Sequence, residues 1–313
     1  MPGKYTYGPV PSRRLGFSLG IDIVPMKTCS YNCIYCQLGT TTNNTIERKE
    51  YTPRDRILQE VKDTVKQSGH IDYLTFSGSG EPTLHAGLGY LITELKKITP
   101  IPIAVLTNGS LLFESSVQRD LINADVVVPT LCTTSQEIFQ EIHRPHASLT
   151  IEKIIQGLID FRKKYRGKIW LEIMLVKGIN DSETDIEKLH EVVEKISPDK
   201  IHLNTVVRPP SEKRATPLSY RELEKIRNML GAKPEIIAPF KETREAVHLH
   251  DIHQSILNII ERRPVTLDDI AAMTGLHKNE ILKYCDQLQK EKKILVTEHD
   301  GHHYYEVIGE EIQ

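Results

Sequence analysis

The segment FSLGIDIVPMKTCSYNCIYCQLG, residues 17–39, runs from an apolar stretch directly into three closely spaced cysteines. Its first part, residues 17–24, is rich in apolar and β-branched side chains, which predicts a β-strand. The spacing Cys29-x3-Cys33-x2-Cys36 then places three thiols within eight residues, directly after that strand. Such close spacing on a loop allows three sulfur atoms to converge on one small object, so this loop is the first candidate for a functional site.

An iron–sulfur cluster suits three such thiols, because thiolates are its usual ligands. No fourth cysteine lies near the loop, since the next one is Cys132. One iron of a cubane cluster would then keep an open position for an outside ligand, as catalytic zinc sites do. A structural zinc ion is the alternative. It usually takes four ligands in two pairs, so here it would need Cys132 or a remote histidine, the nearest being His70.

Strand-like and helix-like segments alternate between about residues 17 and 240. In the helical segments the apolar residues recur on one face, as Ile57, Leu58 and Val61 do within residues 53–67. This alternation predicts an α/β fold with a parallel sheet and helices outside it. About six such units predict a partial (β/α)6 TIM-like barrel, in which the chemistry sits at the C-terminal ends of the strands. Further predicted elements are the strands 72–77, 101–107, 124–130, 168–176 and 199–206, and the helices 151–165 and 183–196.

The tail of the chain has a different pattern. A proline-rich polar stretch at residues 206–217 precedes it, which predicts a change of domain. Within the tail we expect three helices followed by a hairpin that turns at Asp300-Gly301. This order predicts a small winged helix-turn-helix-like α+β domain over residues 250–310, after a barrel domain over residues 1–245. The helices are expected at residues 252–260, 266–275 and 276–293, and the hairpin at residues 294–308.

Composition and charge argue against several classes of protein. The chain has 313 residues, 39% of them hydrophobic, and a formal net charge of −2, so it has no general attraction to nucleic acid or anionic membrane. No run approaches the ~18 apolar residues of a membrane span, and residues 1–14 lack the apolar core of a signal peptide. The five cysteines are an odd number without a secretion signal, which argues against a disulfide framework. We therefore expect a cytoplasmic protein with no membrane partner.

The cysteine loop resembles that of the radical S-adenosylmethionine (radical SAM) enzymes. These enzymes carry the motif CxxxCxxC after the first strand of a partial (β/α)6 barrel. They have an aromatic residue just before the last cysteine, and Tyr35 occupies that place here. The resemblance covers about residues 5–240. The longer pattern in residues 8–39 is similar to one subgroup that is distantly similar to tRNA wyosine-base synthases.

This resemblance implies an activity and two cofactors. Cys29, Cys33 and Cys36 would hold a [4Fe-4S] cluster whose open iron binds S-adenosylmethionine. Reductive cleavage of S-adenosylmethionine would give a 5′-deoxyadenosyl radical that acts on an unknown substrate. An electron donor such as a ferredoxin or flavodoxin would supply the electron. The resemblance also implies that Tyr35 helps to orient S-adenosylmethionine.

Two short motifs after the second and third predicted strands support the resemblance. In SGSGEPTLH, residues 77–85, Ser79-Gly80-Glu81 stands where the family has Gly-Gly-Glu, which binds the methionine end of S-adenosylmethionine. Glu81 would accept hydrogen bonds from the ammonium group of that ligand. The plainer interpretation is a turn with Glu81 at a helix N-terminus. The resemblance likewise implies a ligand contact for Asn108 in LTNGS, which is otherwise an Asn-Gly turn.

Three polar residues further along the chain are weaker candidates. Cys132 follows the fourth predicted strand and is a candidate catalytic thiol, a substrate anchor or a buried small hydrophobe. Glu172 faces into a barrel, where a carboxylate is costly unless paired, so it either contacts cofactor or substrate or forms a structural salt bridge. Asn204 ends the sixth predicted strand and is a candidate cofactor contact. Arg208, just after that strand, is a further candidate substrate or cofactor contact. Other polar residues expected to flank the barrel entrance are Ser12, Arg13, Arg14 and Lys27.

The number of cysteines argues against wyosine synthesis as the activity. Wyosine-type synthases hold a second cluster through cysteines upstream of the triplet. Here Cys29 is the first cysteine, and Cys132 and Cys285 alone lie outside the triplet, so a second three-cysteine cluster is excluded.

A nucleic-acid-associated iron–sulfur protein, either tRNA-modifying or DNA-binding, is the alternative function. Such a protein would bind nucleic acid through the tail. Residues 251–308 contain seven Lys and Arg against ten Asp and Glu, a balance of 7 − 10 = −3, which is poor for neutralising phosphates. The tail sequence therefore favours protein contacts, substrate capture or dimerisation over DNA, and nucleic acid is a partner that we do not favour.

Overall fold

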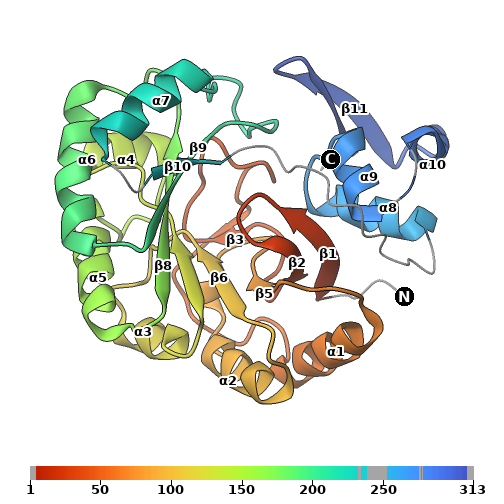
Figure 1. The fold of residues 1–313 in the computed structure, drawn as a ribbon, viewed down its shortest axis with the longest axis horizontal. Coiled ribbons are helices and arrows are strands. Elements are labelled where there is room, and N and C mark those ends of the chain that lie inside the picture. Colours follow the sequence, from red (N-terminus) through yellow and green to blue (C-terminus); the bar gives the residue numbers. More distant parts are fainter. Residues whose placement is uncertain (1–4, 232–233, 238–251, 275, 277, 309–313) are drawn as a thin grey trace.

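The core of the protein is one curved eight-stranded sheet (Figure 1). The computed structural model describes residues 5–231, 234–237, 252–274, 276 and 278–308. The strand order is β1-β2-β5-β6-β7-β8-β9-β10, and every neighbouring pair is parallel except β1 with β2. This confirms the predicted α/β fold with a parallel sheet. The strands are β1 (Thr6–Ser12), β2 (Gly16–Ile21), β5 (Tyr73–Phe76), β6 (Ile103–Thr107), β7 (Val126–Pro129), β8 (Lys168–Leu175), β9 (Lys200–Thr205) and β10 (Pro234–Ile236).

Helices between the parallel strands cover the outer face of the sheet (Figure 1). Each buries an apolar stripe, as the sequence pattern predicts; in α1 the stripe is Ile57, Leu58 and Val61. Among the described residues, none of the helices combines the length and apolar character that a membrane span requires. The helices are α1 (Arg54–Gln67), α2 (Leu88–Ile98), α3 (Ser115–Leu121), α4 (Gln136–His143), α5 (Ile151–Lys164), α6 (Glu183–Ile196) and α7 (Tyr220–Met229).

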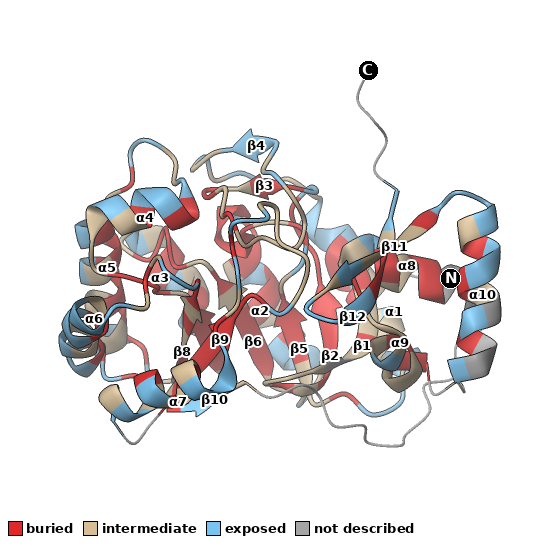
Figure 2. Ribbon diagram, turned by 90° about the horizontal axis from the view of Figure 1, so that it is seen from above, coloured by how far each residue is buried: buried red, intermediate tan, exposed pale blue. Residues whose placement is uncertain are grey.

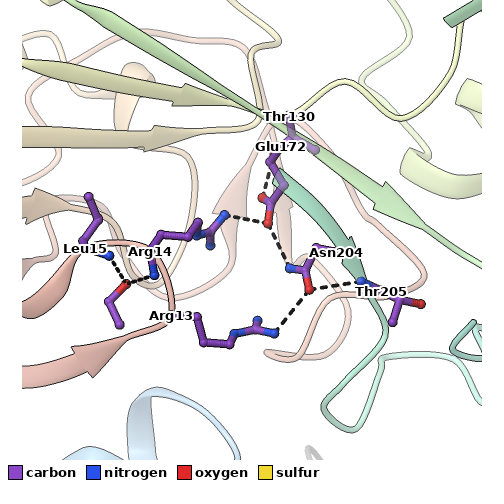
Figure 3. Close-up of polar contacts among 8 residues, drawn as sticks. Arg13, Arg14, Leu15, Thr130, Glu172, Asn204 and Thr205 are labelled. Atoms are coloured by element: carbon purple, nitrogen blue, oxygen red, sulfur yellow. Dashed lines mark hydrogen bonds and ion pairs between the residues drawn. The ribbon is translucent and has the colours of Figure 1, made fainter. Parts of the chain in front are cut away.

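The sheet extends beyond the six predicted strands at both edges. Strand β1 forms an antiparallel hairpin with β2, and β10 pairs with β9 at the opposite edge. The hairpin turn, residues 13–15, is fixed by the Ser12 hydroxyl, which accepts hydrogen bonds from the backbone N–H groups of Arg14 and Leu15. This turn carries two arginines toward the inside of the barrel (Figure 3).

The tail contains three helices and a hairpin in the predicted order, with a hydrophobic core of its own. Its hairpin turns at Asp300 and Gly301, both of which have positive φ angles (50° and 73°). The winged-helix identity of the tail and the division at residues 245–250 stay predictions, and residues 238–251 lie outside the described part of the chain. The elements are α8 (Ile252–Arg262), α9 (Leu267–Thr274), α10 (Lys278–Lys290), β11 (Ile294–His299) and β12 (His302–Val307).

The tail packs against the β1 edge of the barrel (Figures 1 and 2). Val10 of β1 joins the hydrophobic core of the tail. The Tyr304 hydroxyl donates to the backbone carbonyl of Val207 over 2.6 Å. Arg262 forms an ion pair with Asp22, the residue that follows β2. The tail is therefore joined to the barrel close to the segment that leads into the three cysteines.

Candidate active site at the cysteine loop

The cysteine loop leaves the C-terminal end of β2 and lies across one end of the barrel strands. Its first cysteine is in β3 (Thr28–Cys29), which pairs with β4 (Asn43–Asn44); both lie beyond the strand ends (Figure 2). The middle of the loop is held from two sides. Ile34 N–H donates to the Ile142 carbonyl of α4 over 2.9 Å, and the Ser211 hydroxyl donates to the Ile34 carbonyl over 2.9 Å. The loop is thus fixed by backbone contacts rather than by its thiols.

The three thiols are free and partly buried, and each has a different polar neighbour. The Cys33 N–H and C=O lie in a tight turn, since Cys36 N–H donates to the Cys33 carbonyl over 3.1 Å. Within the described residues, no three His, Cys, Asp or Glu side chains are grouped to hold a single metal ion. The neighbours are Asn108 Nδ2 at 3.5 Å from Cys29 Sγ, His143 Nδ1 at 3.2 Å from Cys33 Sγ, and Lys27 Nζ at 3.2 Å from Cys36 Sγ.

The chemistry of these residues fits an iron–sulfur cluster with three protein ligands. Three soft sulfur donors lie on one loop, with no disulfide among them. Burial, with the nearby Glu81 carboxylate as a second cause, raises the pKa of Cys29 to about 12. A neutral thiol is therefore the resting form here, and a bound metal would replace its proton.

The predicted Ser79-Gly80-Glu81 motif packs directly against the strand that ends in Cys29. The N–H of Glu81 donates to the Thr28 carbonyl over 3.1 Å, and the Lys27 N–H donates to the Ser79 carbonyl over 2.7 Å. A Cβ atom on Gly80 would lie 1.9 Å from the Thr28 carbonyl oxygen, so only glycine allows this approach. Ser79 in turn donates from its N–H and hydroxyl to Asp22.

Glu81 is almost completely buried, with 2% of its surface exposed. Its carboxylate accepts four hydrogen bonds, from the N–H and hydroxyl of Thr83, the hydroxyl of Thr107 and the N–H of Asn108, at 2.6–3.0 Å. These bonds join the loop after β5 to the end of β6. A carboxylate offers about four acceptor positions, so Glu81 acts within this structure as a group that positions Asn108. The plainer prediction of a turn cap also has support, because Glu81 caps the short turn Pro82–Leu84.

Asn108 lies between this carboxylate and the first cysteine. Its side-chain N–H group donates to the Ser30 hydroxyl over 2.9 Å and reaches the sulfur of Cys29 at 3.5 Å. Its side-chain oxygen accepts from the Ser110 N–H over 2.9 Å. The structure therefore brings Asn108 to the cysteine loop, and its contact with a ligand stays a prediction.

Tyr35 and Cys132 meet on the barrel side of the loop. The Tyr35 hydroxyl lies 3.4 Å from His143 Nδ1, and the charge of either thiol, Cys33 or Cys132, would raise the pKa of Tyr35. Cys132 is 2% exposed, and burial raises its pKa to about 12. Burial lowers the pKa of His143 to about 3, so its imidazole is neutral near pH 7. His143 was not among the predicted site residues; in the structure it is the last residue of α4.

Glu172 and Asn204 lie together deeper in the barrel and are held by the β1–β2 turn (Figure 3). Arg14 donates to Glu172 over 2.6 Å, Asn204 donates to the same oxygen over 2.9 Å, and Thr130 donates to the other over 3.3 Å. Arg13 donates to the Asn204 side-chain oxygen over 3.3 Å. Burial opposes ionisation of Glu172, but Arg14 and Asn204 outweigh it and hold its pKa below the usual range. The salt-bridge interpretation of Glu172 therefore has direct geometric support.

The predicted site residues form two groups. One surrounds the thiols, and the other, Glu172 with Asn204, lies further into the barrel. Cys132 and Tyr35 lie between the two groups, because the Glu172 charge acts on both. The group around the thiols comprises Ser79, Gly80, Glu81 and Asn108.

Comparisons with known proteins give the class of this chain. The model of the radical SAM superfamily matches residues 23–190. The UPF0026 protein of Methanocaldococcus jannaschii is 37% identical over 309 residues, which cover 96% of this chain and 94% of that protein. A protein named GTPase Obg from Brachyspira hyodysenteriae is 39% identical over 294 residues, which cover 93% of this chain but 43% of that longer protein. The chain belongs to the radical SAM superfamily.

Solved structures share the fold. A structure of TYW1 with a lysine-pyruvate adduct has a TM-score of 0.51 at 20% identity, covering 72% of this chain and 75% of that one. A radical SAM methyltransferase from Sphaerobacter thermophilus has a TM-score of 0.53 at 15% identity, covering 70% and 65%. These likenesses concern the fold and confirm the partial barrel. Membership of the superfamily makes this chain an enzyme that uses a [4Fe-4S] cluster and S-adenosylmethionine.

Proposed function

We propose that Cys29, Cys33 and Cys36 hold the [4Fe-4S] cluster and that S-adenosylmethionine binds between this loop and the ends of β5 and β6. The observation that carries the proposal is the set of three free thiols on one loop that the barrel fixes through its backbone. The bound cluster would supply the electron that cleaves S-adenosylmethionine reductively to a 5′-deoxyadenosyl radical. The residues of the chain would bind the cluster and S-adenosylmethionine, orient them and exclude water from the site.

Three side chains would adjust the reduction potential of the cluster. Hydrogen bonds to cluster sulfurs are one of the ways in which proteins set its reduction potential. Asn108, Lys27 and His143 each place a nitrogen within 3.5 Å of one cysteine sulfur. Lys27 also brings a positive charge to a site where it is 7% exposed. These donors favour the more negatively charged, reduced state of a cluster at this loop.

The Ser79-Gly80-Glu81 segment and Asn108 would form the S-adenosylmethionine side of the site. Gly80 keeps the backbone close to Thr28, and Glu81 holds Asn108 through its N–H. In this proposal Glu81 is a positioning residue, because its Oε2 atom accepts from the Asn108 N–H while its Oε1 atom accepts from Thr83 and Thr107. Tyr35 would contact the ligand from the cysteine loop.

The substrate would occupy the barrel between Tyr35 and the Glu172–Asn204 pair. Cys132 is the buried thiol that faces this region and is the candidate catalytic group. A ferredoxin or flavodoxin would reduce the cluster. The cytoplasm is the expected compartment, because an oxygen-sensitive cluster with free thiols needs reducing surroundings.

Anaerobic reconstitution tests the proposal. The protein is loaded with iron and sulfide, reduced in the presence of S-adenosylmethionine, and assayed for 5′-deoxyadenosine and iron content. Cys33→Ala should lose both the cluster and the product. Cys285→Ala, a change in the buried core of the tail, is the matched control and should retain about four irons per chain and the product. A Cys33→Ala protein that kept its iron and its activity would contradict the assignment.

A further inference from the structure

Four arginines from three separate segments meet where the barrel faces the tail. Arg13 and Arg14 come from the β1–β2 turn, Arg208 follows β9, and Arg263 follows α8. They are close enough for their charges to repel one another: Arg13 acts on Arg208 and Arg263, and Arg14 acts on all three others. Figure 3 shows two of the four, Arg13 and Arg14.

Within the part of the chain that the structure describes, two carboxylates, Glu172 and Asp269, face these four arginines. Arg14 pairs with Glu172 over 2.6 Å, but Arg208 lies 3.8 Å from Asp269, which is a long contact. The charge of Asp269 also acts on Arg263 and, after that of Glu172, on Arg13. Guanidinium groups stay charged in proteins near neutral pH. Four positive charges against two negative ones leave an excess of two.

Burial makes this excess unfavourable for the protein alone. The Arg208 side chain is 13% exposed, and its buried Nε atom has no hydrogen-bond partner among the described residues. Burial, and next the charge of neighbouring arginines, lowers the pKa of both Arg13 and Arg208 to about 10. Buried donors and charges that lack partners are costly, and a bound anion would satisfy them.

The arginine cluster is continuous with the barrel interior. Arg14 donates to Glu172, whose other oxygen accepts from Thr130 at the end of β7. The Glu172 charge also acts on Cys132. A ligand group held by the arginines would therefore extend from the side of the barrel that faces the tail toward Cys132 and Tyr35.

We propose that Arg13, Arg14, Arg208 and Arg263 bind a phosphate group of the substrate, so that the substrate is a phosphate monoester. A monoester carries about two negative charges at neutral pH, which matches the excess of two. Arginine is also the residue that presents paired donors to phosphate oxygens. The identity of the ligand as the substrate rests on the proposed function, whereas the anion site does not. The tail would complete this site through Arg263.

Binding of inorganic phosphate to the reconstituted full-length protein tests the inference. Isothermal titration calorimetry at constant ionic strength would compare phosphate with acetate. The fluorescence of Trp170, the single tryptophan, gives a second signal, because Trp170 lies two residues from Glu172 and packs on His202 at 5.5 Å. We expect saturable phosphate binding that Arg208→Gln and Arg263→Gln each weaken by about tenfold or more. Arg227→Gln, on the exposed face of α7 beside Glu224, should bind as the wild type does.

Asp269→Asn distinguishes a binding role from a structural one. The change removes a competing negative charge but keeps an oxygen that can accept from the Thr266 N–H. It should tighten phosphate binding, and an arginine cluster with a purely structural role would show no such gain. Absence of saturable phosphate binding in the wild type, or tighter binding of acetate than of phosphate, would overturn the inference. Because these measurements need neither reductant nor turnover, a failure to form 5′-deoxyadenosine would reject the proposed function and leave this result standing.

Discussion

The Nδ1 atom of His143 lies 3.2 Å from the sulfur of Cys33, in a partly buried contact between α4 and the cysteine loop. The imidazole packs edge-on against the Tyr35 ring at 5.7 Å and lies tilted against the Phe139 ring at 5.5 Å. The backbone carbonyl of His143 accepts a hydrogen bond from the Asn32 N–H over 2.8 Å. The same residue therefore fixes the backbone of the loop and places a nitrogen at one of the proposed ligands.

His143→Phe should lower the reduction potential of the cluster. Phenylalanine keeps the aromatic packing but cannot donate to the sulfur, and loss of one hydrogen bond worth about 1 kcal/mol corresponds to about 40 mV for a one-electron step. A redox titration followed by electron paramagnetic resonance measures the change. His70→Phe, at an exposed histidine remote from the loop, is the control. An unchanged potential in His143→Phe would show that this contact does not act on the cluster.

Gly80→Ala should prevent the close approach of the two loops around Cys29. The added Cβ would lie 1.9 Å from the Thr28 carbonyl oxygen, so the Ser79–Glu81 backbone must move. We expect at least tenfold weaker binding of S-adenosylmethionine and a lower iron content, measured by equilibrium dialysis and iron analysis. Gly69→Ala is a matched control, because a Cβ there has no atom within 4 Å. Equal behaviour of the two variants would show that the approach has no functional role.

The sequence predicted the repeating part of the fold well, because each helix there carries its own signals. Helix α6 begins and ends at the predicted residues, with Ser182 as N-cap and a buried face at Ile186, Leu189 and Val193. Strand β1 was not predicted. It contains Gly8 and Pro9, which read as turn residues, and as an edge strand it needs fewer apolar positions.

Sequence patterns could not predict which distant segments contact one another. The motif positions of Asn108 and Glu81 are local, so their place beside Cys29 could be expected from the order of the strands. The pairing of Arg14 with Glu172 joins residues 158 positions apart, and it depends on the way the β1–β2 turn enters the barrel. The partner of a buried carboxylate is set by tertiary packing, which a pattern of neighbouring residues does not encode.

Glu81→Gln should destabilise the protein and weaken S-adenosylmethionine binding. The carboxylate accepts from four donors, and an amide NH2 group would face at least one of those donors instead of accepting from it. We expect a loss of about 2–4 kcal/mol in the free energy of unfolding, measured by urea denaturation. Glu94→Gln on the surface of α2 should change that free energy by less than about 0.5 kcal/mol. A stable Glu81→Gln protein with normal binding would argue against the positioning role.

The stability of the protein should fall between pH 7 and pH 5, in part through His202. Burial, and next the charge of Arg14, lowers the folded-state pKa of His202 to about 4, while the unfolded value is about 6.5. Between these values the unfolded chain binds more protons than the folded one, so stability is lost as the pH falls below about 6.5. The contribution of this histidine between pH 7 and pH 5 is about 2 kcal/mol.

His202→Phe should therefore lose less stability than the wild type over the same interval. The phenylalanine ring can keep the packing on Trp170, and among the described residues the Nδ1 atom of His202 has no hydrogen-bond partner that would be lost. Urea denaturation of both proteins at pH 7 and pH 5 gives the two differences in unfolding free energy. All other titrating groups are the same in the two proteins. The wild type should therefore lose more unfolding free energy than His202→Phe, and the amount by which it does is the contribution of His202. Equal losses in the two proteins would mean that His202 is protonated at pH 5 in the folded state, against the burial and Arg14 charge that surround it.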